Sequence, residues 1–260
     1  MAVGAGSVDA ARELSSLVQA EDPDWAVWLL ELAYELGESD ADLASDLEPL
    51  VRRGVESAVS LYEGKLAGMN ASRLSDLADL LRDEYPERAK SLYERAIAAG
   101  DGCYATNGLA NLVRMDDPDR AKELYERAIA AGDEYATNGL GCLICKDDPD
   151  RARSLYERAM AAGDERYAPC NLAHMLIASD PEGAKSLYEG VLAYGEAEAM
   201  LGLAYLLRGS DPARSAGLIS EAKQSEGLAE AVDFIEESLS AVSPDCAIDM
   251  KQFLLEKGIG

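Results

Sequence analysis

The string that decides the fold runs Ala121-Lys-Glu-Leu-Tyr-Glu-Arg-Ala-Ile-Ala-Ala-Gly-Asp133. Nearly the same residues recur at Ala89–Asp101 and at Ala152–Asp164, and a looser copy spans Ala184–Gly195. Self-similarity at a fixed period of this length is typical of repeat proteins, in which each small unit packs only on its neighbours. The sequence therefore indicates a chain built by stacking one unit many times.

The leucine of this string marks the repeat along the whole chain. Its equivalents follow one another at steps of 31 or 32 residues, at Leu29, Leu61, Leu92, Leu124, Leu155, Leu187 and Leu218. The string at Ala121–Asp133 begins just after Asp117-Pro118 and contains Gly132 near its end. Asp caps a helix N-terminus, Pro fits the first helical position and Gly ends a helix in a left-handed conformation. Each string is therefore predicted to be one helix, the B helix of its repeat.

A second helical pattern lies between each such glycine and the next Pro. Its apolar residues follow the spacing i, i+4, i+7, i+8, which places them on one face of an α-helix, the A helix of the repeat. The pattern reads Ala10, Leu14, Leu17, Val18 in the first repeat, Ala105, Leu109, Leu112, Val113 in the fourth, and Ala136, Leu140, Leu143, Ile144 in the fifth. At the other end, Ala231 and Ile235 begin the last A helix, and Ser243–Glu256 forms the last B helix. We predict an all-α solenoid of about eight antiparallel helix pairs in one domain over residues 1–260.

Composition and charge narrow the choice of partner. The hydrophobic fraction, 48%, is too high for a disordered acidic chain, so the net charge of −25 belongs to the surface of a folded body. This charge argues against nucleic acid and anionic membranes, because phosphate binding requires clustered Lys and Arg. A basic peptide or protein is the electrostatically easier partner, although an acidic surface also serves simple solubility.

The sequence gives no sign of export or membrane insertion. The segment Met1–Arg12 lacks a basic stretch followed by an apolar core, so no signal peptide is expected. No apolar run approaches the length of a transmembrane helix. Five cysteines scattered over the chain do not form a disulfide framework. We therefore expect a cytoplasmic protein with reduced thiols.

The fifth repeat carries a resemblance to a known family. Its pattern runs Gly132-x-x-x-Ala136-x-x-x-Leu140-Gly141-x-x-Ile144, followed by Arg151-Ala152-x-x-x-Tyr156-x-x-Ala159 and Gly163. This resembles the Sel1-like repeat, a relative of the tetratricopeptide repeat. The Gly-x-Gly-Val loop usual in that family is replaced by a short Asp-Asp-Pro turn, which accounts for the period of 31–32 residues. The resemblance implies a right-handed α-solenoid that acts as an adaptor and binds peptides or partner proteins on a concave face lined by the A helices.

The candidate binding positions lie on the A helices, opposite their apolar stripe. They form columns of Tyr, Asn and other side chains, which suit a peptide because Asn both donates and accepts hydrogen bonds and Tyr offers area with a polar tip. The candidates are Tyr104, Asn107, Asn111, Arg114, Tyr135, Asn138, Cys142, Tyr167, Cys170, His174 and Tyr205. The first three repeats place a more polar and less regular set there, including Arg12, Ser45 and Asp79. A second interpretation stays open: these side chains are copies left by duplication, or they pack between neighbouring A helices.

No catalytic or metal site is expected. Cys142, Cys145, Cys170 and His174 are the possible zinc ligands, but Cys145 and Cys170 stand seven residues out of register on adjacent helices, about 10 Å apart at the helical rise. Zinc requires all of its ligands about 2 Å from one point. No phosphate-binding loop and no dinucleotide-binding glycine pattern occurs, and His174 is the only histidine. We expect a non-enzymatic adaptor without a cofactor, or, as the alternative, an acidic protein that sequesters a basic partner or acts as its chaperone. The sequence leaves the oligomeric state open.

Overall fold

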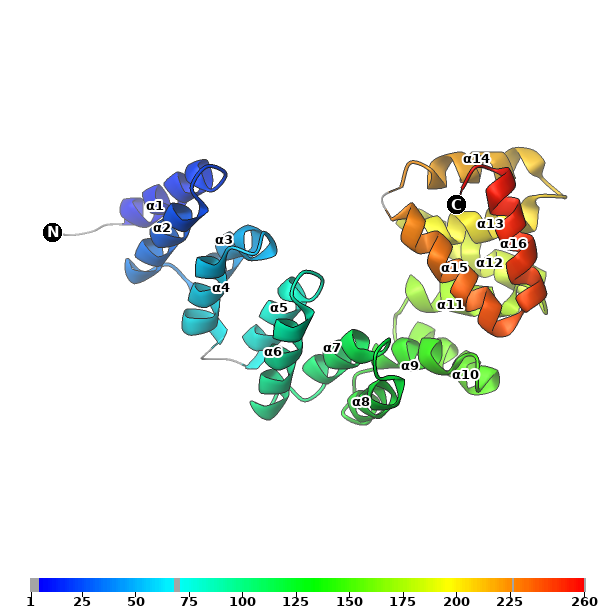
Figure 1. The fold of residues 1–260 in the computed structure, drawn as a ribbon, viewed down its shortest axis with the longest axis horizontal. Helices are drawn as coiled ribbons and strands as arrows, with labels where there is room; N and C mark the ends of the chain where they lie inside the picture. Colours follow the sequence, from blue (N-terminus) through cyan, green and yellow to red (C-terminus); the bar gives the residue numbers. More distant parts are fainter. Residues whose placement is uncertain (1–4, 68–70, 226, 260) are drawn as a thin grey trace. The chain divides into compact units, whose positions relative to one another are not determined.

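The computed structural model describes residues 5–67, 71–225 and 227–259, and helices make up most of these ranges (Figure 1). The first four residues, which enter the expectation about a signal peptide, lie outside the described residues. Sixteen α-helices in the described ranges form eight consecutive pairs, which confirms the predicted all-α repeat fold. None of the described helices is long and apolar enough to cross a membrane.

The internal contacts divide the chain into two compact units, residues 1–131 and 132–260, each with four helix pairs. The first unit contains α1 (Ala5–Val18), α2 (Pro23–Glu35), α3 (Asp40–Arg52), α4 (Glu56–Tyr62) with a π-helical extension η1 (Glu63–Ala67), α5 (Ala71–Leu81), α6 (Pro86–Ala98), α7 (Tyr104–Val113) and α8 (Pro118–Ala130). The second unit contains α9 (Ala136–Ile144), α10 (Pro149–Ala161), α11 (Tyr167–Leu176), α12 (Pro181–Val191) with a 3-10 turn η2 (Leu192–Tyr194), α13 (Ala197–Leu207), α14 (Pro212–Ala222), α15 (Leu228–Val242) and α16 (Pro244–Glu256).

The ends of the B helices follow the predicted capping chemistry. The Asp117 carboxylate accepts a hydrogen bond from the Arg120 backbone N–H at 3.1 Å, and Asp148 accepts one from Arg151 in the same way. At the other end Gly132 has φ +99°, a conformation that favours glycine. These local signals start and stop each helix within about 13 residues, which leaves too little apolar surface for one pair to fold alone.

The repeated tyrosine of the B helix packs toward the A helices. Tyr93, Tyr125 and Tyr188 are among the largest fully buried side chains of the chain. A Cβ added to Gly108 would lie 2.5 Å from the Tyr93 ring, and one added to Gly202 would lie 2.4 Å from the Tyr188 ring. These small residues of the A helices therefore make room for the tyrosine of a B helix.

The first pair departs from the predicted core. Leu14 and Leu17 were expected on the buried stripe, but both are exposed, whereas the equivalent Leu109 of the fourth pair is buried. Leu109 is covered by the preceding B helix, and among the described residues no such helix precedes α1. Trp25 and Trp28 of α2, the chain's two tryptophans, are also largely exposed.

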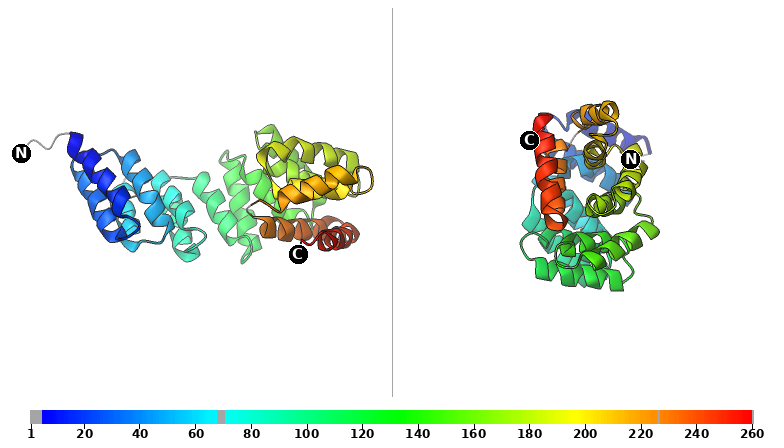
Figure 2. Two further views of the ribbon diagram at one scale, coloured as in Figure 1. Left: turned by 90° about the horizontal axis from the view of Figure 1, so that it is seen from above. Right: turned by 90° about the vertical axis from the view of Figure 1, so that its right-hand side faces the viewer.

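The last pair departs from the repeat in its placement. In both units the B helix of a pair packs on the next A helix, for example α6 on α7 and α10 on α11. Apart from its own partner α16, the helix α15 instead contacts α11 and α13, the A helices of the two preceding pairs (Figure 1). Figure 2 shows α15 and α16, coloured orange to red, beside the yellow-green and yellow helices of the same unit. The predicted last A and B helices exist, with the observed bounds Leu228–Val242 and Pro244–Glu256, but they do not continue the stack as a simple eighth repeat.

Candidate functional site

The A helices of the first unit present both free and engaged polar side chains. Tyr104 at the start of α7 is 55% exposed, and its hydroxyl donates a hydrogen bond to Asp79 of α5, which also accepts one from Tyr93. Asn111 accepts a hydrogen bond from the Tyr125 hydroxyl at 2.7 Å. The Tyr104 ring is exposed, as recognition of a partner requires, but the Tyr104 hydroxyl and the Asn111 oxygen already bind neighbouring side chains. Both interpretations of the Tyr and Asn columns, recognition and packing, therefore find support in this unit.

Asn107 and Arg114 complete the candidate positions on this helix. Both are half-buried, and the Asn107 side-chain oxygen lies 3.5 Å from the Asn111 amide nitrogen, at the limit of a hydrogen bond. The Asn107 side chain is therefore the least committed amide of the set.

A hollow of about 400 Å³ lies between α3 and α5, on the same side of the A helices as Asp79. It is lined by Ala41, Ala44, Ser45, Glu48, Tyr62, Arg73, Asp76, Asp79 and Leu80. Three carboxylates face one guanidinium in this set, and the Arg73 guanidinium lies 3.5 Å from the Asp76 carboxylate. Burial raises the pKa of Asp76, and the nearby carboxylates of Asp79 and Asp101 act in the same direction. The lining of the hollow is therefore acidic, although Glu48 already pairs with Arg52 at 2.9 Å and Asp79 lies 4.0 Å from Arg82.

The sequence pattern did not predict this hollow. Ser45 and Asp79 were expected on the inner face, the side of the A helices opposite their apolar stripe. They belong to the more polar and less regular set of the first three repeats. One signal could have identified Asp79: it precedes Tyr93 by 14 residues, as Asn111 precedes Tyr125. At this spacing the tyrosine of the B helix reaches the inner-face residue of its own A helix, so the inner-face residue of each repeat can be read from its Leu-Tyr pair.

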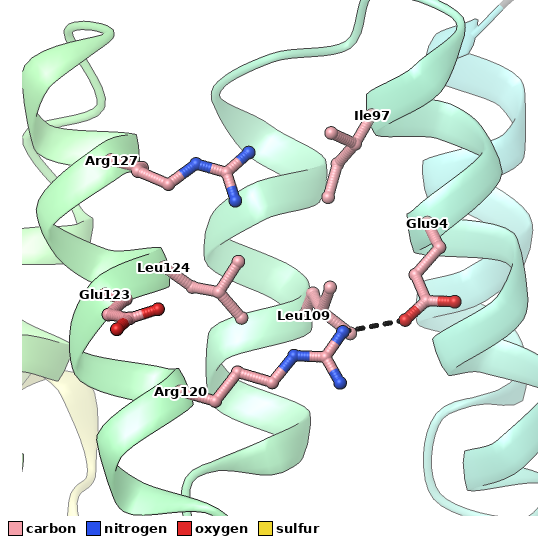
Figure 3. Close-up of a pocket in the computed structure, with 7 residues that line it drawn as sticks. All are labelled: Glu94, Ile97, Leu109, Arg120, Glu123, Leu124 and Arg127. Atoms are coloured by element: carbon pink, nitrogen blue, oxygen red, sulfur yellow. Dashed lines mark hydrogen bonds and ion pairs between the residues drawn. The ribbon is translucent and has the colours of Figure 1, made fainter.

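A second, smaller hollow of about 230 Å³ lies between the B helices α6 and α8 (Figure 3). Ile97, Leu109 and Leu124 point into it, and an ion pair of 2.8 Å joins Arg120 to Glu94 across it. The candidate positions on the A helices do not line it. This ion pair links consecutive B helices, so the hollow belongs to the packing between pairs.

Two tyrosines of the second unit are also exposed, although the Arg166 guanidinium lies over the Tyr167 ring, 5.0 Å from its centre. Tyr135 lies immediately before α9 and is 70% exposed, and Tyr167 at the start of α11 is 53% exposed. Asn138 and Cys142 are half-buried and share Asn171 as a neighbour. The Asn171 amide donates to the Asn138 oxygen at 2.8 Å and lies 3.2 Å from the Cys142 sulfur. The amide of Asn138 is therefore tied to the next A helix.

The other three candidates of this unit do not lie on an open face. Cys170, His174 and Tyr205 are only 2%, 1% and 4% exposed. The ring of Phe234 from α15 lies 5.9 Å from the His174 ring, and the ring of Phe253 from α16 lies 5.9 Å from the Tyr205 ring. The expected free concave surface over α11 and α13 is thus covered by the last helix pair, a long-range packing that the repeat pattern could not reveal.

Burial sets the protonation of the covered groups. It lowers the pKa of His174 to about 4, which keeps the imidazole neutral near pH 7, and it raises the pKa of the Cys170 thiol. Neither ring nitrogen of His174 nor the Tyr188 hydroxyl has a hydrogen-bond partner among the described residues. Buried polar atoms are nearly always paired, so this cluster is an unusual one.

The described residues bring no three potential metal ligands together. Cys142 is half-buried, Cys170 and His174 are buried, and these three side chains form no such group. The described geometry therefore gives no support to a zinc site at these positions.

The comparisons with known proteins identify the fold. No protein-family model matches the sequence, and no curated protein is significantly similar to it in sequence. The structure matches that of a protective antigen present in uropathogenic Escherichia coli strains, which displays the Sel1-like repeat (SLR) fold, with a TM-score of 0.57 and 19% sequence identity. The match covers 88% of this chain and 56% of that protein, so the chain spans a little over half of its length. The chain has the Sel1-like repeat fold that its sequence pattern indicated.

Proposed function

We propose that this chain is a non-catalytic adaptor that binds a segment of another protein along the inner, A-helix side of its repeats. A Sel1-like repeat fold typically serves as a protein-interaction scaffold, and proteins with this architecture act through an extended surface. The observation that carries the proposal is the exposed Tyr104 ring, whose hydroxyl donates to Asp79 of the hollow between α3 and α5. Tyrosine is enriched at binding hot spots because it buries much area and keeps a polar tip.

The proposal extends to the whole chain as one repeat domain over residues 1–260, working in the reducing cytoplasm. The exposed Tyr135 and Tyr167 of the second unit would contribute to binding together with Asn138 and Cys142. Cys170, His174 and Tyr205 are buried in this structure, so they would contribute only when the last helix pair is displaced, since Phe234 of α15 lies against His174 and Phe253 of α16 lies against Tyr205.

Site-specific photocross-linking tests the location of the partner. A photoreactive phenylalanine analogue at Tyr104 should form adducts with one protein in the native cell, and the same analogue at Lys122 on the outer side should not. The partner identified in this way should then bind Asn107→Ala more weakly, since the free amide is lost, whereas Lys122→Ala should bind like the wild type. Equal adducts from both positions, or unchanged binding by Asn107→Ala, would contradict the inner-face assignment.

The acidic hollow supports a second candidate function, the sequestering of a basic protein. Glu48, Asp76 and Asp79 would hold a Lys or Arg side chain of that partner, while Arg73 limits the net charge of the hollow. The double variant Glu48→Gln/Asp76→Asn should then weaken binding strongly, and affinity should fall steeply as salt screens the attraction. If neither the double substitution nor the salt concentration changed the affinity, the sequestering function would be refuted. The adaptor function would then remain, with an uncharged segment of the partner as its ligand.

A further inference from the structure

The inner face of α11 and α13 is occupied by a helix that does not belong to the regular stack. In the regular repeats an A helix lies against the preceding B helix, as α13 does against α12. Besides its own partner α16, the helix α15 packs across α11 and α13 instead. It therefore occupies the side of the A helices on which the repeat pattern places ligand-binding residues.

The helix α15 fills this face as a ligand helix would. Val232, Ile235 and Leu239 are buried on one side of it, at the spacing i, i+3, i+7, while Asp233 on the other side is exposed. Phe234 adds its ring against His174 at 5.9 Å. An amphipathic helix that lays one apolar stripe into a groove of other helices is a recurrent mode of peptide recognition.

The covered face is not fully satisfied by this occupant. Both ring nitrogens of His174 and the Tyr188 hydroxyl are buried without a hydrogen-bond partner among the described residues, and their rings lie 5.6 Å apart. An unpaired buried polar atom costs stability, and a partner atom that supplied the missing hydrogen bond would recover it. A different helix with the same apolar stripe and one hydrogen-bonding side chain near His174 would therefore fit this face better than α15 does.

We propose that the inner face of α11 and α13 is a helix-binding groove, that α15 is its occupant within the chain, and that a partner binds by displacing α15. The partner is an amphipathic helix with a stripe of β-branched and aromatic residues and one polar side chain directed at His174. This inference rests on the adaptor function and assigns it a second site. Because α15 is tethered, it competes at a high effective concentration, so the groove accepts only a helix that binds better than α15.

Cys170 reports whether the groove is open. Its thiol is 2% exposed on α11, about one helical turn before His174, whereas Cys103 of the first unit is half-buried and serves as an internal reference. The variant Phe234→Ala removes the ring that lies against His174 without adding a charge. Ile248→Ala on the outer side of α16 is the matched control, since Ile248 is exposed.

The experiment measures alkylation of Cys170 by iodoacetamide, followed by peptide mass spectrometry, in the full chain. Phe234→Ala should raise the Cys170 rate roughly tenfold, as expected when part of a buried aromatic contact is lost. Ile248→Ala and the Cys103 rate should not change. A synthetic peptide of residues 228–242, added to Phe234→Ala, should bind the vacated groove and return the Cys170 rate toward the wild-type value.

Two outcomes would overturn the proposal. Unchanged Cys170 labelling in a folded Phe234→Ala variant would show that α15 is a fixed part of the core, and a peptide without effect would show that the face does not accept helices. If the variant loses helical circular dichroism, hydrogen exchange on the wild-type chain decides instead. The amides of α15 should exchange through a local opening that leaves α11 and α13 protected, whereas equal protection of all three helices would refute displacement.

These measurements need no natural partner. They can therefore fail while cross-linking at Tyr104 succeeds, or succeed while it fails, so the groove and the adaptor function are tested separately.

Discussion

At the scale of single residues, the repeated tyrosine shows how one position can serve different roles. Tyr125 and Tyr188 occupy equivalent places in the repeat, and both are fully buried. The hydroxyl of Tyr125 donates to Asn111, whereas that of Tyr188 has no partner among the described residues. The same side chain is therefore satisfied in one repeat and unsatisfied in another, because the A-helix residue 14 positions earlier has changed from Asn to His.

This difference predicts opposite effects of one substitution. Tyr125→Phe should destabilise the chain by about 1 kcal/mol, the usual net value of a lost hydrogen bond. Tyr188→Phe should be neutral or stabilising, because it removes a buried hydroxyl that binds nothing. Urea denaturation of both variants checks this, and a comparable loss in the two would mean that Tyr188 has a partner such as ordered water.

His174 gives a residue-scale prediction on pH. It is the chain's only histidine, so its ring resonances can be assigned directly. Burial lowers its pKa to about 4 in the folded state, below the ordinary value near 6.5, so its ring signals should not shift between about pH 8 and pH 5. The unfolded chain binds the proton more readily, so the stability provided by the neutral ring should be present above pH 6.5 and lost as pH falls toward 4. His174→Leu should remove this acid-sensitive contribution to the stability of the folded chain. An ordinary titration of the ring near 6.5 in the folded wild type would instead show that the ring is accessible to water.

At the scale of the elements, local chemistry decides where each helix stops. Gly163 follows α10 with φ +102°, and no atom lies within 4 Å of an added Cβ. Gly190 lies inside α12, also has open space around its Cβ, and is not among the glycines with positive φ. The two glycines therefore differ only in the backbone conformation that they adopt.

Alanine at these positions should act in opposite directions. Gly163→Ala should cost about 1–2 kcal/mol, since a side chain disfavours the left-handed region. Gly190→Ala should stabilise by up to about 1 kcal/mol, because alanine is the better helix former. Thermal melts of the two variants test the assignment, and a stabilising Gly163→Ala would contradict the left-handed ending of the repeat.

The carboxylate of Glu198 makes the stability of the second unit depend on pH. Burial of Glu198 on α13 raises its pKa to about 7, the nearby Glu196 adds to this shift, and Arg166 partly opposes it. The protonated form is favoured in the folded state, so this contribution to stability is present below the unfolded value of 4.5 and is lost as pH rises through 7. Glu198→Gln should therefore raise the melting temperature at about pH 8 and have little effect at about pH 4, near the unfolded value. An equal effect at both pH values would exclude a titrating Glu198 as the cause.

At the scale of the whole molecule, the net charge affects the stability of the folded chain. The net charge of −25 is spread over a chain of 260 residues, and such a charge opposes the compact state by self-repulsion. Raising ionic strength from about 0.01 M to about 0.15 M shortens the Debye length from about 30 Å to about 8 Å. The melting temperature should rise over this range, and calorimetry at both salt concentrations checks it. A fall would mean that the favourable ion pairs, such as Arg158 with Glu134 at 2.7 Å, outweigh the repulsion.

The sequence alone determined the helices and their pairing. Asp-Pro starts, glycine ends and the spacing of apolar residues act within one or two helical turns, so they can be read without knowing what lies far away in the chain. For the same reason the repeat phase could separate Tyr104, Tyr135 and Tyr167 from the apolar stripe, and all three are exposed in the structure.

Only the tertiary structure decided which inner-face residues are covered. The hollow between α3 and α5 depends on how two helices of different pairs pack, and the burial of His174 and Tyr205 involves rings from a helix pair at least 23 residues further along the chain. A repeat pattern shows which apolar residues of each helix pair are available to pack on the neighbouring pairs. It does not record that α15 leaves the stack, because its own apolar stripe is equally able to bury itself on a preceding B helix or on the inner face of α11 and α13.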